Sequence, residues 1–364
     1  MTAPFLTLPP MPSAGHSASR HRRRAVPALL LLATLLVLFC APPQAPAAQY
    51  PEFIAERDFR GFVHRHMAER TARTVAEIAA MDHAARLLVN EPDLQFAHGV
   101  SGDTAPPPLP LDGLARMLFT TPLAANGIQG FPPNVRAVTH VRLIPPDNMR
   151  KALHAALLRP DLLEIHSQVL RTQRSLVAQY DSLAAHLLSL HPMDGGGKEE
   201  SHVLQSIVNE MTAMDMFISL LPLYEQNWNS PQKAREELQK AHTLAPKNPL
   251  LLTALAEVLL QLDRAPAAME HVGDALRVNP EFARAHDVKG AILLRQRLPV
   301  LAAESFAKAI ALSPRNAAYR VHRASALLVL EDETGMCSEF QNACSLGDCE
   351  GFQWAKSVGK CKQF

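Results

Sequence analysis

Apolar side chains recur at every third or fourth position through two long stretches of the chain, which is the spacing of one face of an α-helix. The first stretch covers residues 161–190 and the second covers 204–221. Between them lies HPMDGGGKEE, whose glycines indicate a loop. Two amphipathic helices joined in this way predict an antiparallel hairpin with coiled-coil-like packing, which we place at 148–224.

Two polar residues, His166 and Gln173, interrupt the apolar face of the first of these helices. We expect them to find partners within the hairpin and so to fix its register. A ligand-binding role for the two side chains is the alternative.

After the hairpin, the pattern repeats itself with a period of 34 residues, and seven columns of similar residues share this spacing. Small residues such as Gly290 and Ala302 lie where two helix axes would approach closely. Pro280 and Pro314 recur where one unit ends and the next begins. Because no unit of this kind buries its apolar face alone, several units must stack.

This pattern resembles the tetratricopeptide repeat family, whose unit of 34 residues is a pair of antiparallel helices. The resemblance covers about residues 215–348. It implies an all-α fold, an α-solenoid of about three to four helix-pair repeats preceded by the hairpin. The units are 215–248, which is degenerate and has Pro222 in its first helix, then 249–282, 283–316 and 317–348.

The resemblance also implies a concave groove, lined by the first helix of each unit, that binds a peptide or helix of a partner protein. Leu260, Leu294 and Leu328 form an apolar ladder on this face, free for a partner or covered by the protein's own N-terminal helices. The acidic Glu257 and Asp287 argue against the family's clamp for C-terminal carboxylates. The expected groove residues are Thr253, Glu257, Leu260, Arg284, Asp287, Leu294, Ser325 and Leu328.

The N-terminus has the three parts of a secretory signal peptide: a basic stretch at 20–24, an apolar stretch at 25–41 and small residues before a processing site. We therefore predict a signal peptide over 1–48, cleaved near Ala47 or Ala48, and a periplasmic or secreted protein. An uncleaved segment that anchors the protein in the membrane is the alternative.

Residues 49–147 are expected to begin with one or two amphipathic helices up to about residue 90. The proline-rich remainder, 91–147, contains APPPLPLDG and LIPPDN and indicates an irregular, partly ordered connector.

Four of the five cysteines lie close to the C-terminus, and in an oxidising compartment an even set of cysteines usually forms disulfides. Antiparallel packing of a short last helix favours the nested pairs Cys344–Cys349 and Cys337–Cys361, which would staple a cap over 349–364. The other connectivities stay open, as do a zinc site and a redox pair. The resemblance to exported bacterial tetratricopeptide repeat proteins with such an ending favours the staple.

The sequence contains no zinc-protease helix, nucleophile elbow, phosphate-binding loop or haem-attachment motif. The net charge of +1 predicts no nucleic-acid partner. We therefore expect an exported, non-catalytic scaffold or adaptor without metal, cofactor or small-molecule substrate, whose partner is another envelope or periplasmic protein. The alternatives are a homo-oligomer joined through the hairpin, and a metal-binding or redox subunit that uses the C-terminal cysteines.

Overall fold

The computed structural model describes residues 52–58, 65–89, 111–119, 134–140, 146–157, 159–189 and 197–362, all within one compact unit, 50–364. The N-terminal elements are β1 (Glu52–Asp58), α1 (Arg65–Val89), α3 (Leu111–Phe119), β2 (Asn134–His140), α4 (Pro146–Leu157), α5 (Pro160–Ser189) and α6 (Gly197–Glu225). The elements that follow are α7 (Pro231–Leu244), α8 (Pro249–Gln261), α9 (Ala265–Val278), α10 (Ala283–Arg295), α11 (Pro299–Leu312), α12 (Ala317–Val329), α13 (Glu333–Ser345) and α14 (Glu350–Ser357).

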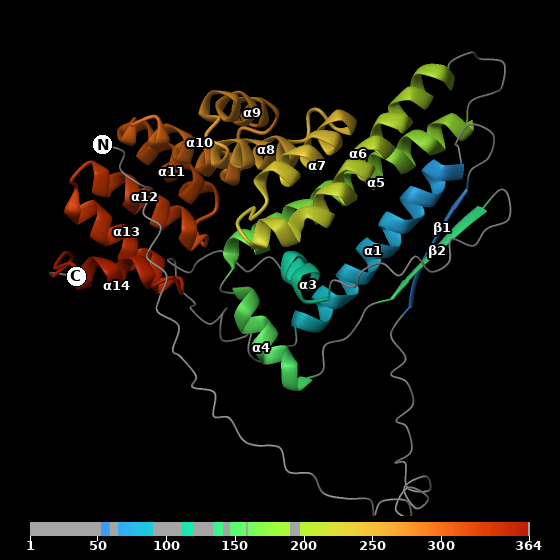
Figure 1. Cartoon of the computed structure of the whole chain (residues 1–364). Helices are drawn as coiled ribbons and strands as arrows, with labels where there is room; N and C mark the ends of the chain where they lie inside the picture. The colour runs from blue at the N-terminus through green and yellow to red at the C-terminus, as the bar shows by residue number, and fades with distance from the viewer. Residues whose placement is uncertain are drawn as a thin grey trace, which may run out of the picture. The chain divides into compact units, whose positions relative to one another are not determined.

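Consecutive helices pack in pairs along the second half of the chain: α8 with α9, α10 with α11, and α12 with α13 (Figure 1). The predicted helical solenoid is thereby confirmed. Gly290 shows why the repeat positions demand small residues, since an added Cβ would lie 2.6 Å from the Phe306 ring. The two helices of this pair could not keep their spacing with a larger residue at that position.

Each pair turns on one residue in the left-handed region, at the same position of the repeat. Asp263, Arg297 and Glu331 have φ angles of 59°, 61° and 61°. Residues other than glycine adopt this backbone region at a cost in free energy. The repetition of the conformation every 34 residues shows that the three turns share one geometry.

The hairpin is formed by α5 and α6, which pack side by side (Figure 1). Its second helix continues through Pro222 as the first helix of the degenerate repeat and packs on α7. One apolar core runs from Ile165 and Val169 of α5, through α6, to Ile292 of α10. Burial of this continuous core joins the hairpin to the first two units and to the first helix of the third.

A small two-stranded sheet stands beside α1 and adds to the helical fold. β1 and β2 are antiparallel, with Glu52 opposite His140 and Asp58 opposite Asn134. The sequence-based helix over residues 49–90 is present in α1, but it is wrong for 52–58, because these residues pair with a strand far away in the chain. The proline-rich connector likewise contains α3 and β2.

The C-terminal cap is held by two disulfides, Cys337–Cys361 with a Cα–Cα distance of 5.4 Å and Cys344–Cys349 with 4.0 Å. This is the pairing that the sequence favours. The short helix α14 lies on α13, where Trp354 meets Phe340 edge to face with 6.4 Å between ring centroids. Each of the four sulfurs is bonded to one other sulfur, so none of the four cysteines has a free thiolate that could hold a metal.

The predicted signal peptide, 1–48, and the connector stretches 91–110 and 120–133 lie outside the described residues. Among the helices that are described, none has the length and apolarity needed to cross a membrane. In the same part of the chain, no group of three or more histidine, cysteine, aspartate or glutamate side chains could hold a metal ion.

Candidate functional site: the face formed by the first helices of the repeats

The predicted partner-binding residues lie on α8, α10 and α12, the first helices of three successive units. We call the side of these helices that carries them the first-helix face. The structure divides its residues into two groups. Thr253, Arg284 and Asp287 are buried. Glu257, Ser325 and the three leucines of the ladder, Leu260, Leu294 and Leu328, are partly exposed.

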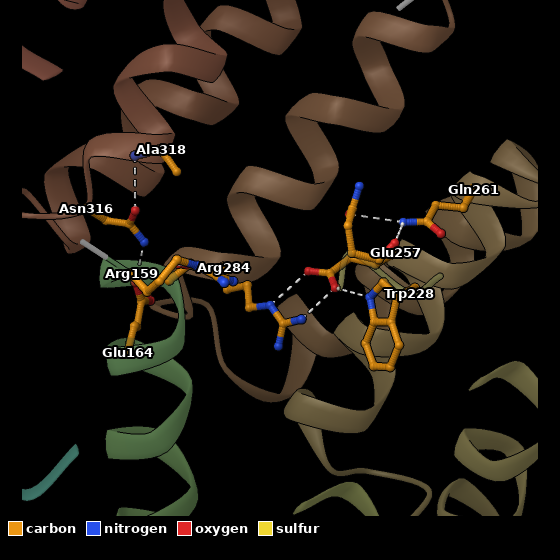
Figure 2. Close-up of polar contacts among 10 residues, drawn as sticks. Arg159, Glu164, Trp228, Glu257, Gln261, Arg284, Asn316 and Ala318 are labelled. Carbon is orange, nitrogen blue, oxygen red and sulfur yellow. Dashed lines mark hydrogen bonds and ion pairs between the residues drawn. The ribbon is translucent and has the colours of Figure 1, made fainter. Parts of the chain in front are cut away.

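The centre of the first-helix face is a buried ion pair between neighbouring units. Arg284 on α10 donates from Nε to Oε1 of Glu257 on α8 over 2.8 Å, and from Nη2 to Oε2 over 2.5 Å. Oε2 also accepts a bond of 3.1 Å from the indole Nε1 of Trp228 (Figure 2). Two parallel bonds between a guanidinium and a carboxylate fix the orientation of the two side chains as well as the distance between them.

Residues at the end of the hairpin cover this ion pair. The Arg284 guanidinium lies over the ring of Tyr224, 4.6 Å from its centroid, and Tyr224 meets Trp228 edge to face at 5.5 Å. Burial alone would lower the pKa of Arg284, but the Glu257 carboxylate and the neighbouring Tyr224 outweigh it and raise the pKa. Arg284 is therefore charged, and its partners come from the same chain.

A second polar pair joins α10 to α12. Asp287 and His322 approach to 2.8 Å, with the Nδ1 of the histidine facing Oδ1 of the carboxylate. Burial acts to lower the pKa of His322, whereas the Asp287 carboxylate and its hydrogen bond raise it, and the net direction is upward. The histidine side chain remains half-exposed, so this pair forms the edge of the buried polar region.

A third contact comes from the hairpin and reaches the far unit. The Oε2 of Glu164, on α5, accepts a bond from Asn316 Nδ2 at 3.0 Å (Figure 2). It also accepts bonds from Ser313 Oγ at 3.1 Å and from the Tyr319 hydroxyl at 3.0 Å. Burial, together with the nearby Glu164 and Asp287 carboxylates, raises the pKa of Tyr319. The phenol therefore stays protonated and keeps donating to Glu164.

Asn316 also caps α12, and an asparagine two units earlier does the same for α8. Asn316 Oδ1 accepts from the backbone of Ala318 at 3.2 Å, and Asn248 Oδ1 accepts from that of Leu250 at 3.0 Å. Asn248 in turn donates to Glu210 of α6 at 3.1 Å. Each asparagine thus uses its oxygen for the helix cap and its amide nitrogen for a glutamate of the hairpin.

Comparison with known proteins supports the reading of the repeat. The sequence profile of the tetratricopeptide repeat family matches residues 229–292. The protein carries a tetratricopeptide repeat array. None of the curated proteins matches the chain in sequence.

Several solved structures are similar to part of this chain, at low identity and low TM-score. MamA from Desulfovibrio magneticus RS-1 is 20% identical over 38% of this chain and 76% of its own, with a TM-score of 0.32. Pseudomonas aeruginosa PilF is 19% identical over 51% and 86%, with a TM-score of 0.35. YrrB, described as a tetratricopeptide repeat protein with an unusual peptide-binding site, is 15% identical over 51% and 89%, with a TM-score of 0.34.

The contacts within the tetratricopeptide array change the assignment of its polar residues. Glu257, Arg284 and Asp287 were expected to face a partner, but they bond to each other and to neighbouring helices of the chain. Thr253 is fully buried. The side chain of Ser325 is partly exposed, although its hydroxyl bonds back to the Val321 carbonyl at 2.9 Å.

The sequence did not identify the residues of the hairpin, and of the loop that follows it, that contact the polar residues of the array. Trp228, Tyr224 and Glu164 carry no mark of this role in the sequence, because their partners lie in other repeats. The N-cap asparagine before α12 was the one available signal, since it recurs two units after Asn248. The alternative of coverage concerns the leucine ladder, whereas the residues that the hairpin contacts here are Arg284 and Asn316.

His166 and Gln173 are both buried, and the partners of Gln173 differ from those expected. Gln173 accepts from Arg116 of α3 at 3.3 Å and donates to Glu77 of α1 at 3.4 Å, so it ties α5 to helices outside the hairpin. Burial, reinforced by the positive charge of Arg116, lowers the pKa of His166 to about 3. The imidazole is neutral, which fits a packing role beside a buried cation.

Proposed function

We propose that this protein is an exported, non-catalytic adaptor that binds another protein of the cell envelope through the open part of the first-helix face. The observation that carries the proposal is the leucine row: Leu260, Leu294 and Leu328 occupy one repeat position and all are partly exposed. The charged residues of the same face bond within the chain. Apolar side chains are thus what the array still offers to a partner.

The repeat spacing of the row favours a protein partner over a small ligand. Equivalent side chains on successive first helices are presented at regular intervals along the array, which suits an extended peptide or an amphipathic helix. Partly exposed leucines arranged in a row, with polar residues around them, are typical of a protein interaction site. Ser325, on the same helix as Leu328, would lie at its border.

Site-specific photo-crosslinking tests this proposal. A photoreactive residue placed at Leu294 or Leu328 in living cells should yield one discrete crosslinked product, because a partner helix would contact both positions. The same residue at Lys308, which is exposed on the second helix of its unit, is the control and should yield none. In the variant Leu294→Glu, crosslinking from position 328 should fall at least about tenfold, since one buried carboxylate costs several kcal/mol.

Three results would contradict the adaptor: equal products from all positions, no product from either leucine, or a yield from position 328 that Leu294→Glu leaves unchanged.

Export to the envelope is tested on the mature protein. We expect N-terminal sequencing to find Ala48 or Gln49 as the first residue, because the small residues after the apolar stretch suit signal peptidase. A mature chain that still begins near Met1 and sediments with membranes would instead establish the anchored alternative.

A further inference from the structure

Stacked repeats normally contact only their neighbours, but the hairpin of this protein contacts units that are not adjacent to one another. Glu210 of α6 bonds to Asn248 at the start of α8. Glu164 of α5 bonds to Asn316 at the start of α12. The unit between them begins at Phe282, which makes no side-chain cap. Besides its contact with Arg284 of that unit, the hairpin therefore contacts the capped starts of α8 and α12, which lie two repeat periods apart.

The contacts at Asn248 and at Asn316 differ in strength. Around Asn248, the neighbouring helices share buried apolar residues, among them Met214 and Leu251. Around Asn316, the contact between α5 and α12 is small, and the hydrogen bonds from Ser313, Asn316 and Tyr319 all end on one oxygen of Glu164. A contact that depends on a few polar bonds opens more easily than one that buries apolar surface.

We propose that the α5–α6 hairpin is a brace across the repeat array, and that the bonding of Glu164 to the head of α12 is a releasable clasp that sets the spacing of the units. This deepens the adaptor function proposed above and rests on it only for its biological use. With the clasp closed, the leucines of α8, α10 and α12 are held at fixed intervals, so a partner meets a preorganised row. Release of the clasp lets these intervals vary.

The clasp is sensitive to pH through its own carboxyl group. Burial raises the pKa of Glu164, and the bonds from Asn316, Tyr319 and Ser313 offset part of that rise. A carboxyl group whose pKa is raised by folding stabilises the closed state below its unfolded pKa. That contribution is lost as the pH rises through the folded value. The clasp should therefore weaken as the pH is raised.

Other ionisable groups surround the clasp, and one of them titrates in the same sense. Since the pKa of His322 is raised, its bond to Asp287 also weakens as the pH increases. The variant His322→Gln separates this contribution from that of Glu164. The groups on the elements around Glu164 are Asp161 on α5, Tyr224 on α6, Glu257 on α8, Arg284 and Asp287 on α10, and Tyr319 and His322 on α12.

The spacing of the units can be measured directly in the mature protein. Spin labels at Arg264 and Val329, both exposed, report the distance between the far ends of α8 and α12. We expect a narrow distance distribution in the wild type at pH 5 and a broader one at pH 8. The variant Glu164→Ala should be broad at both pH values. Glu164→Gln keeps an accepting oxygen without a charge, so it should stay narrow at both.

Hydrogen exchange provides the second readout and the matched control. In Glu164→Ala, amides in the first turn of α12 should exchange about tenfold faster, because their anchor to α5 is lost. The control is Asp332→Ala, which removes the cap bond to Gly335 at the start of α13 without touching the hairpin. It should loosen α13 alone and leave the distance distribution unchanged.

A Glu164→Ala protein with the wild-type distance distribution would overturn the brace, and so would Asp332→Ala broadening it as much. Neither measurement involves a partner, so this failure is distinct from that of the adaptor proposal, which the crosslinking at Leu294 decides.

Discussion

Replacing Arg284 by alanine is expected to lower the free energy of unfolding by about 3–5 kcal/mol, the cost of breaking a buried ion pair from one side. The Arg284 side chain is 5% exposed and that of Glu257 is 19% exposed, so water can solvate the remaining carboxylate only in part. Trp228 would still donate to it, but a single neutral donor does not replace a bidentate guanidinium. Chemical denaturation followed by circular dichroism measures the loss.

A double variant separates the cost of the orphaned charge from the worth of the pair. Glu257→Gln with Arg284→Met removes both charges and keeps similar volumes, so it should recover most of the stability that Arg284→Ala loses. The matched surface control is Lys240→Ala, which removes an exposed pair with Glu237 and should leave the stability unchanged. If the double variant were as unstable as Arg284→Ala, the loss would come from packing against Tyr224 instead.

Removing the buried disulfide of the cap is the second large effect. The double variant Cys337→Ala, Cys361→Ala is expected to lose about 3.4 kcal/mol, because the bond closes a loop of 24 residues in the unfolded chain. Both sulfurs are buried against Phe340 and Ala355, so the loss should open α14 first. Guanidinium unfolding of the oxidised protein measures the free energy, and protease cleavage after Lys356 reports the opening.

The shorter disulfide supplies the comparison. Cys344 and Cys349 close a loop of only 5 residues, so the variant that lacks this pair should lose about 2 kcal/mol. Because this disulfide is partly exposed at the end of α13, its removal should leave α14 packed against α13. A larger loss from this pair than from Cys337 and Cys361 would contradict loop closure as the source of the stabilisation.

The repeat array could be predicted from sequence because its determinants are local and periodic. Position 290 requires a small residue because a larger one would clash with the ring of Phe306. The same requirement returns in every unit, so the 34-residue period makes it visible in the sequence. The disulfide pairing could be predicted for a related reason, since both cysteine pairs lie within one helix pair and its cap. Patterns of this kind need no knowledge of distant partners.

The remaining features depend on partners far away in the chain. β1 reads as part of an amphipathic helix until β2, about 80 residues later, supplies its hydrogen bonds. Glu164 looks like an ordinary surface residue of a helix until Asn316 and Tyr319 are placed beside it. No local spacing records such pairings, and for that reason the covering of Arg284 by the hairpin was also missed.

Asn248 and Asn316 have one consequence for how this chain can change its length. An open solenoid tolerates the duplication or deletion of a whole unit, since each copy touches only the next. Here a deletion of residues 249–282 would leave Asn248 and Asn316, the partners of Glu210 and Glu164, one unit apart, with α10 and not α8 following Asn248. The hairpin can therefore keep both of its contacts, at Asn248 and at Asn316, with only one number of repeat units between them.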